Sequence, residues 1–155
     1  MSAATTSVFG ELDEWQAMLG RHEELFTEMV PGSSVAIVPK EGSGIQPGKH
    51  VAGLMAAEGA GEMLRWEVVP GGMRAARVPY RGFQDAKVDL LFVADSEAME
   101  KLRGNLDDNT LSLMKRQIRA GNIMFFVMRT KYELQDAGYE ELLDTLGLAF
   151  LGACR

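Results

Sequence analysis

The stretch from Lys87 to Met128 constrains the fold more than any other part of the chain. It begins with one apolar run, Val88 to Ala94, and ends with another, Ile123 to Met128. Between them lie two short segments whose apolar residues recur at helical spacing. Short apolar runs bounded by turn residues predict buried strands, and the pattern between them predicts two amphipathic helices. The stretch therefore predicts strand, helix, helix and strand in succession.

The two helices have recognisable ends. Asp95 is placed to cap the N-terminus of a helix over residues 96–103, and Gly104 to end it in the left-handed conformation. The second helix starts at Asp108 or Asn109 and is expected to end at Gly121.

The chain before this stretch predicts one helix followed by strands. Apolar residues recur at helical spacing from Phe9 to Met29, and strands are expected at 34–39, 63–69 and 73–80. We expect the last two to form an antiparallel meander with the strand at 88–94, in which Val88, Leu90 and Phe92 share one face.

Two segments are expected to be irregular. Residues 1–7 are small and polar and are predicted to be disordered. Residues 40–61 form a glycine-rich connection between the first two strands, within which 50–58 can make a short helix.

The final third of the chain completes an α+β pattern. Thr130 and Glu133 fit a capping box, and the helix that follows extends to about Leu146 with a break at Gly138. Strands in succession followed by clustered helices predict an α+β fold. We expect one domain over 1–155, with a mostly antiparallel sheet of about four to five strands and helices packed on one side.

Composition excludes several classes of function. The net charge of −6 argues against nucleic-acid binding, which needs a concentrated basic face. The single cysteine, Cys154, permits neither a disulfide within the chain nor a cysteine-based zinc site. The first ten residues lack a charged region followed by an apolar run, so we expect no secretory signal, and no apolar run approaches the ~20 residues that span a bilayer. We expect a soluble, cytoplasmic protein without a transmembrane segment.

Catalytic and metal-binding residues do not form a recognisable set. The two histidines, His22 and His50, fall in separate predicted elements and belong to no paired motif. An enzyme would need one of them to converge with carboxylates in a cleft. We therefore predict no catalytic residues, no metal and no cofactor, and favour a non-enzymatic protein.

The run from Val88 to Gly104, VDLLFVADSEAMEKLRG, resembles the sterol carrier protein-2 type lipid-binding domain. That family shows an alternating strand with an early Asp, then an acidic capped helix ending in a glycine turn. The segment from Gly121 to Met128 is similar to the family's glycine-bounded apolar strand. The resemblance covers residues 87–128 in sequence and Phe9 to Leu146 in the order of elements.

The resemblance implies a sterol-carrier-like fold with an internal cavity for a lipid or fatty acyl group. Nine apolar residues would line it: Leu90, Phe92, Met99, Leu102, Met114, Ile118, Phe125, Leu142 and Leu146. From the sequence alone the same residues can equally form an ordinary filled core.

Two functions follow as alternatives. The first is non-enzymatic binding of an apolar small molecule or lipid in that cavity. The second is a small interaction or regulatory subunit without a cavity, which forms a homo-oligomer through an exposed apolar patch; the apolar tail from Leu148 to Ala153 suggests it.

Overall fold

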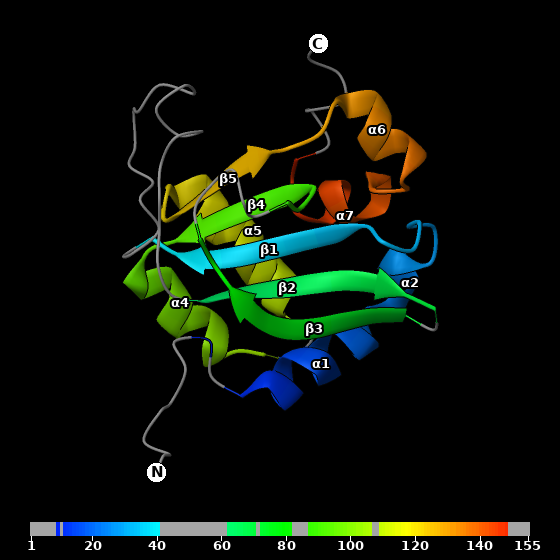
Figure 1. Ribbon diagram of the computed structural model, residues 1–155. Helices are drawn as coiled ribbons and strands as arrows, with labels where there is room; N and C mark the ends of the chain where they lie inside the picture. Colours follow the sequence, from blue (N-terminus) through cyan, green and yellow to red (C-terminus); the bar gives the residue numbers. More distant parts are fainter. Residues whose placement is uncertain are drawn as a thin grey trace.

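The computed structural model describes residues 9, 11–40, 62–70, 72–81, 87–106 and 109–148 of the chain (Figure 1). The strands are β1 (Ser34–Pro39), β2 (Glu62–Val69), β3 (Gly72–Pro79), β4 (Leu90–Ala94) and β5 (Ile123–Val127). The described helices are α1 (Leu12–Arg21), α2 (Glu23–Phe26), α4 (Ser96–Arg103), α5 (Thr110–Ala120), α6 (Lys131–Asp136) and α7 (Glu140–Thr145).

The strands form a single five-stranded sheet in the order β3-β2-β1-β4-β5. The β1–β2, β2–β3 and β4–β5 pairs are antiparallel, and only the central β1–β4 pair is parallel. The expected α+β fold with a mostly antiparallel sheet is confirmed.

The predicted meander is wrong in one respect, because β4 does not pair with β3. It lies on the other side of β1, with Val35 opposite Leu90 and Ile37 opposite Phe92. Residues 35–38 and 90–94 are all buried, so both strands are apolar on both faces. Such strands bury most when they occupy the centre of a sheet, and pairing β1 with β4 places them there.

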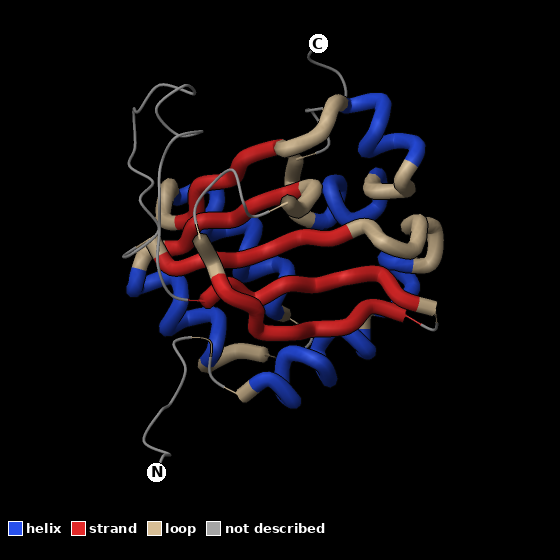
Figure 2. The backbone as a smooth tube through the Cα atoms, in the orientation of Figure 1, coloured by secondary structure: helices blue, strands red, loops and turns tan. Residues whose placement is uncertain are grey.

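The described helices all contribute buried side chains to one face of the sheet, as predicted, and Figure 2 shows most of them behind it, with α6 beyond the end of β5. Their apolar side chains join those of one sheet face in a large cluster, which we call the main core. Trp15 and Leu19 come from α1, Leu111 and Met114 from α5, and Phe92 from the sheet. Burial of this face supplies the main driving force for the fold.

The opposite face of the sheet carries a second, smaller apolar cluster. It includes Val38 from β1 and both Leu91 and Val93 from β4, and no residue of a described helix belongs to it. Val88 also packs here, and not with Leu90 and Phe92 as predicted. The strand begins only at Leu90, so period-two alternation does not extend back to Val88.

Three predicted helix ends are confirmed. The Asp95 carboxylate accepts a hydrogen bond from the Ala98 amide at 2.8 Å. Thr130 and Glu133 form the reciprocal capping box at the start of α6. Gly121 ends α5 in the left-handed conformation, with φ of 86°.

Two predicted ends differ. Gly104 has φ of −85°, so it is not a left-handed cap, and its amide closes the helix by donating to the Glu100 carbonyl. The single helix expected from Phe9 to Met29 is divided into α1 and α2 at His22, whose φ of −113° and ψ of 24° are not helical.

Gly138 holds the predicted break between α6 and α7 and also a close backbone contact. Its φ is +83°, and a Cβ atom added there would lie 2.0 Å from the Glu28 carbonyl oxygen. The neighbouring amide of Val30 donates to the Ala137 carbonyl at 2.9 Å. The turn after α2 therefore packs directly on the α6–α7 turn, where only glycine fits.

Several expectations concern residues outside the described ranges, namely those for 1–7, for the short helix at 50–58 and for the tail beyond Leu148. Among the described helices, none is long and apolar enough to cross a membrane.

We predict that Gly138→Ala lowers the free energy of unfolding by about 3 kcal/mol, because the added methyl group collides with backbone and the left-handed conformation is strained. Gly32→Ala is the matched control, since its φ is +96° but no atom lies within 4 Å of an added Cβ. We expect the control to lose only about 1 kcal/mol in urea unfolding. Equal losses in the two variants would contradict the contact.

Candidate functional site

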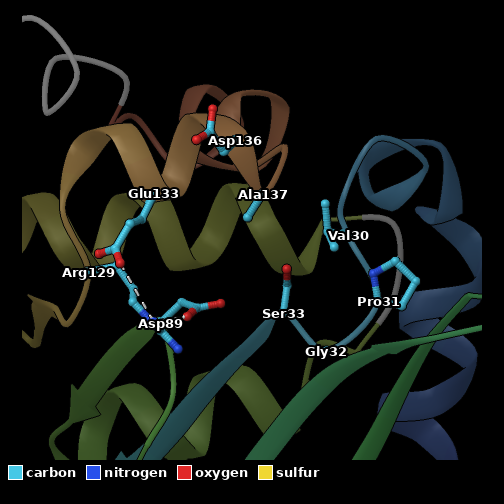
Figure 3. Close-up of a pocket in the computed structure, with 9 residues that line it drawn as sticks. All are labelled: Val30, Pro31, Gly32, Ser33, Asp89, Arg129, Glu133, Asp136 and Ala137. Atoms are coloured by element: carbon cyan, nitrogen blue, oxygen red, sulfur yellow. Dashed lines mark hydrogen bonds and ion pairs between the residues drawn. The ribbon is translucent and has the colours of Figure 1, made fainter.

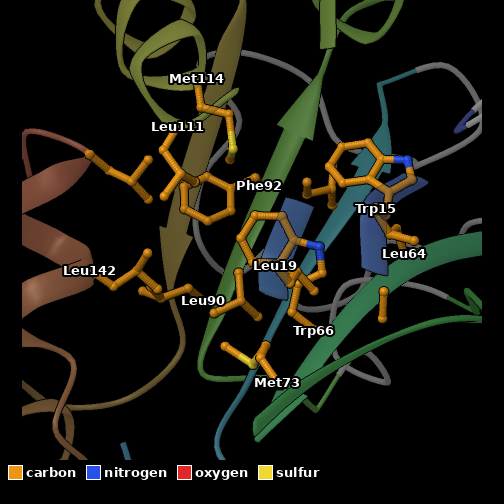
Figure 4. Close-up of a cluster of buried hydrophobic side chains, with 14 of the residues drawn as sticks. Trp15, Leu19, Leu64, Trp66, Met73, Leu90, Phe92, Leu111, Met114 and Leu142 are labelled. Atoms are coloured by element: carbon orange, nitrogen blue, oxygen red, sulfur yellow. The ribbon is translucent and has the colours of Figure 1, made fainter. Parts of the chain in front are cut away.

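The structure brings the nine predicted lining residues together in the main core. They come from β4, α4, α5, β5 and the end of α7. Figure 4 labels four of them, Leu90, Phe92, Met114 and Leu142. Ile118 and Phe125 are partly buried at the margin of the cluster, and the other seven are buried. The residues therefore converge, although their role in binding stays a prediction.

The main core is rich in adaptable and aromatic side chains. Trp15 and Trp66 lie with their ring centroids 6.1 Å apart and their planes tilted by 48°. Methionine side chains are unbranched and flexible and fit irregular spaces. Five methionines belong to the cluster: Met18, Met29, Met73, Met99 and Met114.

The two tryptophans differ in their hydrogen bonding, although each is 0% exposed. The indole nitrogen of Trp15 donates to the Phe9 carbonyl at 2.6 Å. The indole nitrogen of Trp66 is buried and has no acceptor among the residues that the structure describes. A buried donor without a partner is rare and costs about 1–3 kcal/mol. Trp66 thus carries a buried donor in the main core that no described residue satisfies.

A separate polar pocket of about 420 Å³ opens on the surface beside α6 (Figure 3). It contains none of the nine predicted lining residues. It is lined by Val30, Pro31, Gly32, Ser33, Asp89, Arg129, Glu133, Asp136 and Ala137. A second surface pocket, of about 370 Å³, lies between α2 and the β2–β3 hairpin and contains none of the nine either.

Asp89, at the edge of the polar pocket, is buried and held by three donors. Its Oδ1 accepts from Arg129 Nε at 2.8 Å. Its Oδ2 accepts from the Ser34 amide at 3.2 Å and from the Tyr139 hydroxyl at 2.5 Å. The Ser34 carbonyl oxygen lies 3.1 Å from the same hydroxyl. The hydroxyl has one proton, which it donates to the closer Asp89 carboxylate.

These contacts give Asp89 a structural role. A buried carboxylate is stable only when it is paired and hydrogen-bonded, and here both oxygens are engaged. Arg129 is half-exposed, so solvent screens part of its attraction to Asp89. The group joins β1, the residue before β4, the second residue after β5 and the N-cap of α7, and we assign it no catalytic function.

The sequence pattern predicts no site at Asp89, Arg129 or Tyr139. The sequence does place an acidic residue, Asp89, directly before an apolar strand. A carboxylate that is buried there needs a hydrogen-bonding or charged partner. The partners lie 40 and 50 residues away along the chain, so no local pattern connects them.

Burial strongly raises the pKa of the Tyr139 hydroxyl, and its hydrogen bond and charge interaction with Asp89 raise it further. A hydrogen bond from the Ser33 side chain opposes these effects. Burial also raises the pKa of Tyr80 to about 12. Both hydroxyls therefore stay protonated in the folded protein well above the pH at which an exposed tyrosine ionises.

The histidines give no site in the part of the chain that can be described. His22 lies at the junction of α1 and α2, and its buried Nε2 has no partner among the described residues. His50 falls outside the described residues. Within the described ranges, no group of three or more His, Cys, Asp and Glu side chains could hold a metal ion.

We predict that folding stability falls as pH rises above about 10, the ordinary tyrosine pKa. Below that pH both states keep their tyrosine protons; above it the unfolded chain loses them while Tyr139 and Tyr80 stay protonated when folded. Each of the two tyrosines lowers the free energy of unfolding by about 1.4 kcal/mol per pH unit. For Tyr80 this loss extends over pH 10–12. The free energy of unfolding, measured with urea at several pH values in this range, should fall less steeply with pH in Tyr139→Phe and in Tyr80→Phe than in the wild type. An unchanged slope in both variants would contradict the raised pKa values.

Comparison with known proteins gives one remote likeness. No protein-family model matches the sequence, and no curated protein matches it significantly. A solved structure of a conserved hypothetical protein from Thermus thermophilus, suggested to be a sterol carrier protein, is 19% identical with a TM-score of 0.41. The alignment covers 94% of this chain and 90% of that one. A likeness at this level carries no argument about function.

Proposed function

We propose that the protein binds an apolar small molecule of the lipid or fatty acyl class, without catalysing a reaction, within the main core. The nine residues Leu90, Phe92, Met99, Leu102, Met114, Ile118, Phe125, Leu142 and Leu146 would contact the apolar chain. The observation that carries this proposal is the buried indole N–H of Trp66, which has no acceptor among the described residues.

A ligand acceptor would remove an energetic penalty from the core. An unpaired buried donor costs about 1–3 kcal/mol, and a carboxylate, ester or hydroxyl oxygen placed beside Trp66 would recover it. The surrounding side chains are apolar, so a ligand there needs an apolar body and few polar atoms. Lipids and fatty acids have this composition.

The methionines supply a means of making room. Seven of the nine residues are buried within the main core, so an acyl chain that enters it would displace some of their side chains. Met99 and Met114 are among the nine residues, and their flexible side chains can change rotamer at small cost. Each ligand methylene that becomes buried then contributes about 0.8 kcal/mol.

Native mass spectrometry of delipidated protein mixed with palmitate tests the proposal directly. We expect one added ligand mass that disappears on mild denaturation, together with a change in tryptophan fluorescence, because Trp15 and Trp66 both lie in the core. Failure to take up palmitate, with an unchanged fluorescence spectrum, would reject the proposal.

We predict that Trp66→Phe weakens palmitate binding about tenfold and leaves the binding of hexadecane unchanged, because only palmitate offers an acceptor to the indole. Trp15→Phe is the matched control: it changes an equally buried tryptophan whose N–H already donates to Phe9. Calorimetric titration with both ligands measures the difference. The control should lose stability but keep the wild-type ratio of the two affinities. A Trp66→Phe variant with that same ratio would contradict the role of its N–H.

A further inference from the structure

The two edges of the sheet differ sharply in their protection. On the outer side of β3, the Gln16 side chain donates to the Met73 carbonyl at 2.9 Å and accepts from the Ala75 amide at 2.9 Å. This side-chain amide takes the place of a neighbouring strand. Arg77 and Pro79 are also exposed on β3, and a charge and a proline discourage further pairing. The β3 edge is therefore blocked.

The β5 strand contains no charge and no proline, and no described side chain occupies its outer edge as Gln16 does on β3. The strand reads Ile-Met-Phe-Phe-Val, without a charge, a proline or a glycine. Met124 and Phe126 are only partly buried, and Val127 is 38% exposed. An apolar, uncharged edge strand is a ready template for pairing with another strand.

The hydrogen bonds of β5 show which backbone groups are available. The Met128 amide donates to the Asp89 carbonyl, and the Asn122 carbonyl accepts from Asp95, so even-numbered residues face β4. Residues in an antiparallel strand alternate in direction. The N–H and C=O groups of Ile123, Phe125 and Val127 consequently point away from β4, and no described residue bonds them.

We propose that β5 pairs antiparallel with β5 of a second copy of this chain, about a two-fold axis at Phe125. Ile123 would lie opposite Val127 of the second copy, and Phe125 opposite its own equivalent. The two five-stranded sheets would then continue into one another. The proposal is independent of ligand binding.

Self-complementarity of the edge identifies the partner. The outward residues 123, 125 and 127 are symmetric about Phe125, so two copies can satisfy every outward N–H and C=O between them. The intervening pair would place Met124 beside Phe126 of the second copy, a favourable sulfur–aromatic contact. Because the strand carries no charge, no like-charged side chains would face each other across the axis. A two-fold contact of this kind closes as a dimer because it uses the free edge of each copy once.

Sedimentation and light scattering of the full chain test this proposal. We expect a concentration-dependent mass of about twice the 17.0 kDa chain. Val127→Pro should raise the dissociation constant at least about tenfold, because proline removes an outward N–H while the β4–β5 bonds remain. Val127→Lys, which adds a charge at an exposed position, should have the same direction of effect and serves if the proline variant fails to fold.

Arg77→Pro is the matched control, since it places a proline at an outward, exposed position on the blocked β3 edge. It should leave dimerisation unchanged. Hydrogen exchange gives a second readout: the amides of Ile123, Phe125 and Val127 should become protected as concentration rises. A wild-type monomer at roughly 100 μM, well above the range of stable dimers, would overturn the proposal. So would a dimer that survives both changes at Val127.

Discussion

The buried carboxylate of Asp89 is the interaction on which the arrangement of this fold depends. It gathers the Ser34 amide, the Arg129 guanidinium and the Tyr139 hydroxyl at one point. Its backbone adds to this junction, with its amide donating to Ser34 and its carbonyl accepting from Met128. Leaving a buried carboxylate without one of its hydrogen-bond donors costs about 1–3 kcal/mol, so each connected element helps to hold the others in place.

Around this junction, the central pair of parallel strands determines the layers of the molecule. Because β1 and β4 are apolar on both faces, the sheet has an apolar cluster on each side. The described helices cover one of these faces, and the α6–α7 turn meets the turn after α2 at Gly138. The tight contact at Gly138 and the hydrogen bond from Tyr139 to Asp89 come from adjacent residues, so together they fix α6 and α7 against the sheet.

Unequal satisfaction of polar groups is the feature on which both proposals rest. The chain provides partners for Trp15, Asp89 and Tyr139, and a side-chain amide for the β3 edge. It leaves without described partners the indole N–H of Trp66 and the outward backbone of β5. Groups that a protein leaves unpaired at positions of this kind are natural places for a ligand or a second chain.

The sequence by itself determined the elements and their class. Apolar periodicity located the strands and the amphipathic helices, and local capping chemistry located Asp95, the Thr130–Glu133 box and Gly121. These elements and caps depend on neighbours within a few residues, and a pattern along the chain records such neighbours directly. The nine lining residues were instead implied by the resemblance to the sterol carrier protein-2 type domain, and all nine lie in or against the main core.

Only the tertiary structure decided how the elements pair and which polar groups meet. Sequence order suggested that β4 follows β3 in a meander, whereas burial of both its faces places β4 beside β1. The Asp89–Tyr139 hydrogen bond spans 50 residues, and the Gly138–Glu28 contact joins segments still further apart in the chain. Whether the buried N–H of Trp66 finds an acceptor also depends on which residues the fold brings near it. Such facts arise from packing in three dimensions, and no local pattern encodes them.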